Sequence, residues 1–161
     1  MADALPAPYK LQLIRADHVG VERLLQLSDE LMLKLYPPEI CFLDDAATLN
    51  QNNVRLLGLF HHGELVGMGA VKFLNEDIPY GEIKRVFIEA THRGKGLAKY
   101  IMQQLEGWAR EVGVGHLRLE TGPKQPEAVS LYDKLGFQTR GPFGPYEAND
   151  DSIFMEKQLL P

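Results

Sequence analysis

A glycine-rich turn joins an apolar strand to an amphipathic helix near the middle of the chain. The strand ends on Val86-Phe87-Ile88, and after a short connection the turn has the sequence R-G-K-G-L-A at residues 93–98. The helix ends at Gly113, because glycine readily adopts the left-handed conformation that closes a helix. Its apolar residues recur at the spacing of one buried helix face: Leu97, Ile101, Leu105, Trp108 and Val112. A strand followed by such a helix predicts a helical crossover, and hence an α/β fold.

The remaining patterns extend this unit into one sheet with helices on both of its faces. Alternating apolar and polar residues predict a first strand over residues 9–16. A helix is expected to follow from Asp17 until Pro37-Pro38 stop it. A hairpin is expected at His62-Gly63, between two apolar stretches. The other predicted elements are a short helix over 46–52, a loop over 75–81, strands over 82–88 and 116–120, a helix from Pro126 to Gly136, and a last strand over 152–159. The order β-α-α-β-β-β-α-β-α-β-β predicts a mixed, mostly antiparallel sheet.

The length and charge of the chain narrow the class of protein. Its 161 residues suit one domain, which we expect over residues 9–161 after a flexible leader over 1–8. The net charge of -5 argues against a general nucleic-acid binder, since such proteins are usually basic. There is neither a signal-peptide pattern nor an apolar stretch near the ~20 residues that span a bilayer. The single cysteine, Cys41, has no metal-binding spacing around it. We therefore expect a cytoplasmic protein that binds no nucleic acid, membrane or metal.

The glycine-rich turn also predicts a site for an anion. Backbone N–H groups at a helix N-terminus are free to bind an anion, and the helix dipole favours negative charge there. Gly94 and Gly96 allow the backbone to approach it closely. Positive charge comes from Arg93, Lys95 and Lys99. A pyrophosphate group suits this site, although an ordinary turn stays the alternative for the segment taken alone, because the P-loop pattern is absent and the dinucleotide pattern is incomplete.

The turn and a later helical segment together match two signatures of one enzyme family. The pattern R/Q-x-x-G-x-G/A is matched by Arg93, Gly96 and Ala98. The pattern N-x-x-A-x-x-L-Y-x-K-x-G-F is matched by Ala128, Leu131, Tyr132, Lys134, Gly136 and Phe137. Gln125 stands where that pattern usually has asparagine. With these matches and its order of elements, nearly the whole chain resembles the GNAT superfamily of N-acetyltransferases, and within it a bacterial subfamily of small acetyltransferases.

The resemblance implies an acyltransferase that uses acetyl-coenzyme A (acetyl-CoA) as donor, with direct attack by an amine and no acyl-enzyme. In this family a bulge in the fourth strand frees backbone N–H groups beside the acetyl carbonyl. The implied cofactor-binding residues are Val86, Phe87, Ile88, Arg93, Gly94, Lys95, Gly96, Leu97, Ala98, Gln125 and Tyr132. The resemblance implies no metal.

Three residues are candidates for proton transfer. An alkyl amine, with a pKa near ~10.4, is mostly protonated at neutral pH, so some group must take a proton. Glu82 matches the base of the histone-acetyltransferase branch and is our first choice, while Glu120 matches the base of the ribosomal-protein alanine acetyltransferases. Water alone, with both carboxylates merely solvated, is the alternative. Tyr132 is the implied general acid for the departing thiolate, with a purely structural core role as its alternative.

The acceptor is expected to be a primary amine of a small metabolite. In this family fold two connections wall the acceptor side, and here they are the proline-stiffened residues 35–39 and 141–146. Lys84 or Arg85 could pair with a carboxylate on the substrate. The candidate substrate-binding residues are Tyr36, Glu39, Lys84, Arg85, Phe143 and Tyr146. A protein or peptide acceptor and a coenzyme A-binding module without catalysis stay open as alternatives, and so does a homodimer.

Overall fold

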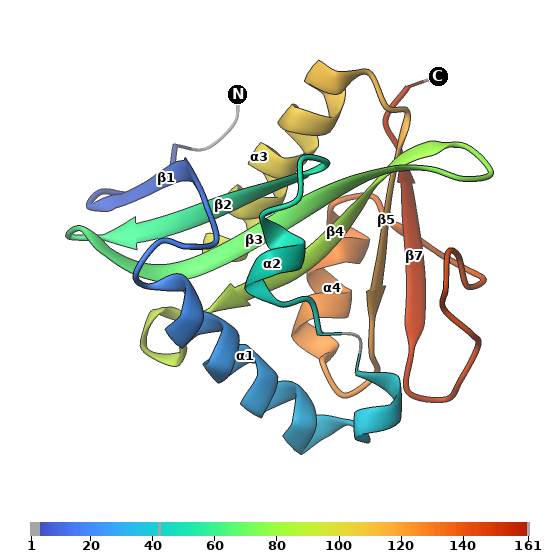
Figure 1. Cartoon of the computed structure of the whole chain (residues 1–161), viewed down its shortest axis with the longest axis horizontal. Coiled ribbons are helices and arrows are strands. Elements are labelled where there is room, and N and C mark those ends of the chain that lie inside the picture. The colour runs from blue at the N-terminus through green and yellow to red at the C-terminus, as the bar shows by residue number, and fades with distance from the viewer. Residues whose placement is uncertain (1–3, 42, 161) are drawn as a thin grey trace.

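One sheet of seven strands organises the computed structural model, which describes residues 4–41 and 43–160. The strands are β1 Tyr9–Ile14, β2 Val54–His61, β3 Glu64–Asn75, β4 Pro79–Ile88, β5 His116–Thr121, β6 Gln138–Arg140 and β7 Ile153–Gln158. The helices are α1 Val21–Leu35, α2 Ala46–Leu49, α3 Leu97–Val112 and α4 Pro126–Lys134, with short 3-10 helices at Pro38–Ile40 and Ala90–His92. The strand order is β1-β2-β3-β4-β5-β7-β6, and β4–β5 is a parallel pair in an otherwise antiparallel sheet. The predicted fold class and element order are confirmed (Figure 1).

Helices cover both faces of the sheet and enclose a core on each. In Figure 1, α1 and α2 lie in front of the sheet, and α3 and α4 lie behind it. Because side chains of a strand alternate between faces, neighbours on β2 enter different cores: Leu56 packs with α1, and Leu57 packs with α3. On the predicted apolar face of α3, Leu97, Ile101 and Leu105 are buried, Trp108 is partly buried, and Val112 at the end is 47% exposed. Of the predicted leader, residues 1–3 lie outside the described residues, while Leu5 packs against the core.

Several predicted boundaries are wrong. The first strand, expected over residues 9–16, ends at Ile14, and the helix expected from Asp17 begins at Val21 with Gly20 as its N-cap. The residues between them form turns instead, in which the N–H groups of His18 and Val21 donate to the carbonyl oxygens of Arg15 and His18. The loop expected over residues 75–81 is shorter, because Asn75 still pairs with Pro79 in the β3–β4 hairpin. Proline is tolerated at the first residue of a strand, where its missing N–H removes no hydrogen bond from the sheet interior. The helix expected over 46–52 ends at Leu49, and Asn50 instead turns its side-chain oxygen to accept a hydrogen bond from the Ala16 N–H at 2.6 Å.

The sheet opens between its two parallel strands. β4 and β5 pair only at Gly81–Leu117 and Glu82–Arg118, and beyond these residues they diverge, as Figure 1 shows. A bulge lies on β4 where the divergence begins, because the pairing with β3 shifts between Lys84 and Phe87 and Arg85 has a φ of 56°. The bulge that the family resemblance implied in the fourth strand is therefore present. The opening leaves one backbone edge of β4 without a partner strand and available to a ligand.

Candidate active site

The glycine-rich turn forms an open cradle at the N-terminus of α3. Gly94 and Gly96 have φ angles of 78° and 71°, and a Cβ added to either would meet no atom within 4 Å. Gly96 caps α3 without a side-chain hydrogen bond, so the first N–H groups of this helix are left for a ligand. Arg93 is tied to the adjoining strand end, since its Nε donates to the carbonyl oxygen of Ile88 at 2.8 Å. The structure thus combines an open backbone cradle with positive charge, as an anion site requires.

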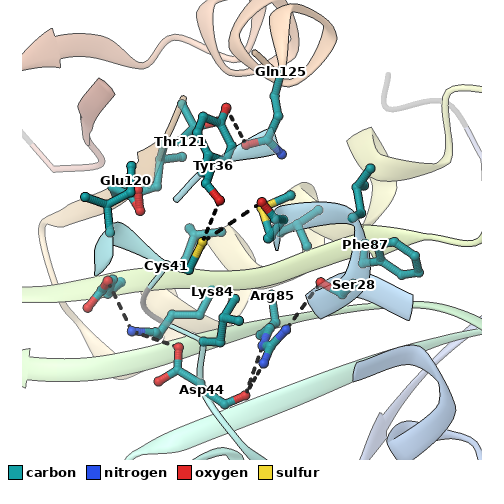
Figure 2. A pocket seen from close by; sticks show the side chains of 18 of the residues that line it. Ser28, Tyr36, Cys41, Asp44, Lys84, Arg85, Phe87, Glu120, Thr121 and Gln125 are labelled. Carbon is teal, nitrogen blue, oxygen red and sulfur yellow. Dashed lines mark hydrogen bonds and ion pairs between the residues drawn. The ribbon is translucent and has the colours of Figure 1, made fainter. Parts of the chain in front are cut away.

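A pocket of about 160 Å³ lies at the opening between β4 and β5. It collects most of the predicted site residues: Tyr36, Glu82, Lys84, Arg85, Val86, Phe87, Glu120, Gln125, Tyr132 and Tyr146. Figure 2 shows Tyr36 and Gln125 on one side of it and Lys84 and Asp44 on another. Residues from α1, from the connection before α2, and from the loop before β7 complete its walls. Segments far apart in the sequence therefore meet where the sheet opens.

Glu82 is buried and already engaged by other side chains. It is 4% exposed, and the Tyr146 hydroxyl donates a hydrogen bond to its Oε2. Lys84 Nζ donates to the same oxygen at 3.4 Å and lies 3.0 Å from Asp44 Oδ2. Burial and then the negative charge of Glu82 raise the pKa of Tyr146, so this hydroxyl stays protonated as a donor. These contacts hold Glu82 in a network, which makes it a poor acceptor for a substrate proton.

Glu120 differs from Glu82 because no described residue pairs with it. It is half-buried at the end of β5, and among residues 4–41 and 43–160 it forms neither a hydrogen bond nor an ion pair. Burial, and then the charge of Glu82, raise the pKa of Glu120 to about 7, against an opposing effect of Lys84. A carboxylate with a pKa near neutrality is suited to accept a proton at physiological pH.

Tyr132 combines a packed ring with a hydroxyl at the pocket. The residue is 8% exposed, and its ring lies 5.9 Å from that of Phe137 in an edge-to-face contact. Its hydroxyl makes no hydrogen bond to any other described residue, although Tyr132 lines the pocket. Burial raises the pKa of Tyr132 to about 12, so it is a proton donor rather than an anion at neutral pH. The core role and the pocket role therefore coexist in one side chain.

The structure separates the other predicted substrate-binding residues. Arg85 is fully engaged, because its guanidinium pairs with Asp29 on α1 and donates twice to the carbonyl oxygen of Asp44, at 2.9 and 2.7 Å. Lys84 is held by Asp44 and Glu82. The expectation that either cation pairs with a substrate carboxylate is therefore not supported, because carboxylates of the protein already occupy both.

Two further expected residues lie outside the pocket. Glu39 lies in the short 3-10 helix Pro38–Ile40, where it is exposed and does not line the pocket. Phe143 is buried in a separate cluster with Tyr80 and Phe154. It bears on the site only through Tyr146, whose ring lies 5.2 Å from its own.

Several residues that line the pocket are not predicted from the sequence, namely Ser28, Leu31, Met32, Ile40, Cys41, Leu43, Asp44, Ile83, Leu119, Thr121 and Asp151. A local signal existed only near Asp44: Asp45 caps α2 by accepting the Thr48 N–H at 2.8 Å, which fixes the preceding residues. The others reach the pocket only through tertiary packing. Within the described residues, no group of three His, Cys, Asp or Glu side chains could hold a metal ion, and no helix is both long and apolar enough to cross a bilayer.

Gly122 makes room for the aromatic wall of the pocket. The Tyr36 hydroxyl donates to Oε1 of Gln125 at 3.3 Å, and burial raises the pKa of Tyr36. A Cβ on Gly122 would lie 2.2 Å from the Tyr36 hydroxyl oxygen and 2.8 Å from the Asp151 carbonyl oxygen. Atoms do not approach this closely, so any side chain at position 122 must displace Tyr36 or the loop before β7.

Gly122→Ala is therefore expected to lower the free energy of unfolding by about 1–3 kcal/mol, the usual cost of overpacking. Urea denaturation measures this loss. Gly141→Ala is the matched control, because a Cβ there would meet no atom within 4 Å. Equal stability of the two variants would show that Gly122 is not needed for the position of Tyr36.

Comparison with known proteins identifies relatives over most of the chain. The model of the acetyltransferase (GNAT) family matches residues 21–137. An IAA acetyltransferase of Azospirillum brasilense is 40% identical over 140 residues, which cover 87% of this chain and 91% of that protein. The crystal structure of a Klebsiella pneumoniae protein described as an acyl-CoA N-acyltransferase has a TM-score of 0.77 at 34% identity, covering 96% of this chain and 100% of that one. The PaiA N-acetyltransferase of Thermoplasma acidophilum, solved with coenzyme A, shares the fold with a TM-score of 0.69 at 18% identity, covering 93% of this chain and 98% of that one.

Proposed function

Because the chain belongs to the GNAT family of acetyltransferases, we propose that it transfers the acetyl group of acetyl-CoA directly to the primary amine of a small molecule. Because it belongs to this family, the chain is an acyltransferase. The class of the acceptor and the roles of individual residues are our proposal. The observation that carries the proposal is the pocket at the β4–β5 opening. One cavity there joins the free edge of β4, the carboxylate of Glu120 and the hydroxyl of Tyr132, and neither side chain is paired with another described residue.

The residues present fit acetyl-CoA as the acyl donor. Its pyrophosphate would bind the cradle of Gly94 and Gly96 at the N-terminus of α3, where no atom lies within 4 Å of an added Cβ. Its pantetheine amides would pair with the unpartnered backbone edge of β4 from Ile83 to Ile88. When bound, acetyl-CoA supplies an acetyl group activated as a thioester.

Glu120 is the base in this proposal, in place of Glu82. The acceptor enters as an ammonium ion and must lose a proton before its nitrogen can attack. Glu120 is free to take that proton, directly or through a water, whereas Glu82 is held by Tyr146 and Lys84. Glu82 still contributes, because its charge helps to raise the pKa of Glu120. In the overall reaction the nitrogen–carbon bond would form and the carbon–sulfur bond would break. The first amine proton would pass to Glu120, and the second, lost from the nitrogen as the amide forms, would balance the proton that the thiolate gains from Tyr132.

Tyr132 acts on the leaving group in this proposal. The departing thiolate needs a proton or a hydrogen bond, and the Tyr132 hydroxyl is a donor without another described partner. Cys41 also lines the pocket, but burial raises its pKa, so it is a poor nucleophile. This favours direct attack by the amine over an acyl-enzyme on Cys41. The small volume of the pocket, walled by Tyr36 and Tyr146, favours a small acceptor over a protein tail.

Tyr132→Phe tests this role while keeping the ring packed. We expect kcat to fall by about 10- to 1000-fold, because general-acid assistance is lost, with little change in the Kd for acetyl-CoA. The assay is amine-dependent release of free thiol from acetyl-CoA. Tyr80→Phe is the matched control, since the Tyr80 hydroxyl likewise makes no hydrogen bond to a described residue but is buried in the separate cluster with Phe143. Equal turnover of the two variants would show that Tyr132 has only a structural role.

A further inference from the structure

Carboxylates outnumber available cations on the walls of the pocket. The lining carboxylates are Asp44, Glu82, Glu120 and Asp151, and the lining cations are Lys84 and Arg85. Arg85 forms its ion pair with Asp29, which does not line the pocket, and with none of these four carboxylates. Among residues 4–41 and 43–160, Lys84 is thus the one lining cation that forms ion pairs with lining carboxylates.

One ammonium group is shared by two of these carboxylates. Lys84 Nζ lies 3.0 Å from Asp44 and 3.4 Å from Glu82, and the three side chains are 12%, 13% and 5% exposed. This trio therefore carries one negative charge that no lysine or arginine balances. Glu120 and Asp151 form no ion pair with any other described residue. Unbalanced carboxylates in a half-buried site are costly unless a ligand brings the missing positive charge.

The same cavity holds a second sign that it is built for a ligand. Tyr132 is 8% exposed and lines this cavity, and its hydroxyl has no hydrogen-bond partner among the described residues. Among the described residues, the fully buried side-chain oxygen without a hydrogen bond is that of Tyr80, so the Tyr132 hydroxyl keeps some access to the pocket. A donor without a protein partner at the wall of a pocket is suited to bind a ligand. The excess negative charge and the unpaired hydroxyl therefore belong to one binding site.

Resting on the proposed function, we propose that the acceptor is a small amine that carries a second positive charge and no carboxylate, of the diamine class. The reacting amine lies near Glu120. The second cation lies near the trio of Asp44, Glu82 and Lys84. Figure 2 shows Asp44 and Lys84 on a different side of the pocket from Glu120. This reverses the expectation of a carboxylate on the substrate, which would meet uncompensated negative charge on both sides.

A series of amines matched in length tests this inference. Pentylamine, cadaverine and δ-aminovalerate share one reacting end and differ at the other by a methyl group, an ammonium and a carboxylate. We expect kcat/KM to be about tenfold higher for cadaverine than for pentylamine, beyond the statistical advantage of two equivalent amino groups, and lowest for δ-aminovalerate. The readout is thiol release from saturating acetyl-CoA.

Asp44→Asn should reduce the preference for cadaverine over pentylamine several-fold, to a few-fold at most, by removing the unbalanced charge of the trio. Asp151→Asn serves as a second variant, because its side chain forms no ion pair within the described chain. Glu111→Gln is the matched control, since Glu111 is 70% exposed on α3 and outside the pocket. A preference for δ-aminovalerate, or an unchanged preference in both pocket variants, would overturn the inference while leaving amine acetylation intact. Thiol release with none of the three amines would instead overturn the proposed function.

Discussion

Glu120→Gln is expected to lower kcat/KM by about 10²- to 10⁴-fold at pH 7, because the amide cannot accept the proton of the acceptor amine. The change is isosteric, and Glu120 has no hydrogen bond or ion pair to lose within the described residues, so the fold should be unaffected. Steady-state kinetics with a fixed amine, together with a thermal unfolding curve, separates the two effects. Turnover within a few-fold of the parent protein would exclude Glu120 as the base.

The pH dependence identifies the base independently of the size of this loss. A general base acts when ionised, so kcat/KM should rise with pH through the pKa of Glu120, about 7. The charge of Glu82 raises that pKa, so Glu82→Gln should move the acidic limb of the profile to lower pH. Ionisation of the amine affects all variants equally and cancels in the comparison. If Glu82→Gln abolished the limb while Glu120→Gln kept it, Glu82 would be the base.

The parts of the fold that the sequence predicts are those with local signals. The face of α3 is predicted by the spacing of Ile101 and Leu105, and the ends of this helix by Gly96 and Gly113, which adopt φ angles of 71° and 90°. The predicted loop before β4 is too long, because Pro79 interrupts the apolar pattern of the sequence although in the structure it begins a strand. Local signals therefore locate the elements better than their ends.

The site is less predictable, because it depends on which distant side chains meet. No pattern in the sequence shows that Arg85 is bound by Asp29 from α1, or that Lys84 lies between Asp44 and Glu82. For the same reason the sequence favoured Glu82 over Glu120: both end up at one pocket, and only tertiary contacts show that Glu82 is engaged and Glu120 is not. Charge balance in a pocket is a tertiary property.

Gly96→Asp is expected to abolish the binding of acetyl-CoA. Position 96 caps α3 with a φ of 71°, and an added carboxylate would place negative charge at the helix N-terminus where the pyrophosphate would bind. Gly113→Asp is the matched control at the other end of the same helix. Gly113 has a φ of 90° and is also open around its Cα, so the two variants share the backbone strain and differ in their place relative to the cradle.

Thermal unfolding in the presence of increasing acetyl-CoA is the direct measurement. Because a ligand that binds only the native state stabilises it, the parent protein and Gly113→Asp should each gain about 2.7 kcal/mol at a hundredfold excess over Kd. Gly96→Asp should gain nothing. A parent protein whose unfolding temperature does not move at millimolar acetyl-CoA, or a Gly96→Asp variant that is stabilised as much as Gly113→Asp, would contradict acetyl-CoA binding at this cradle.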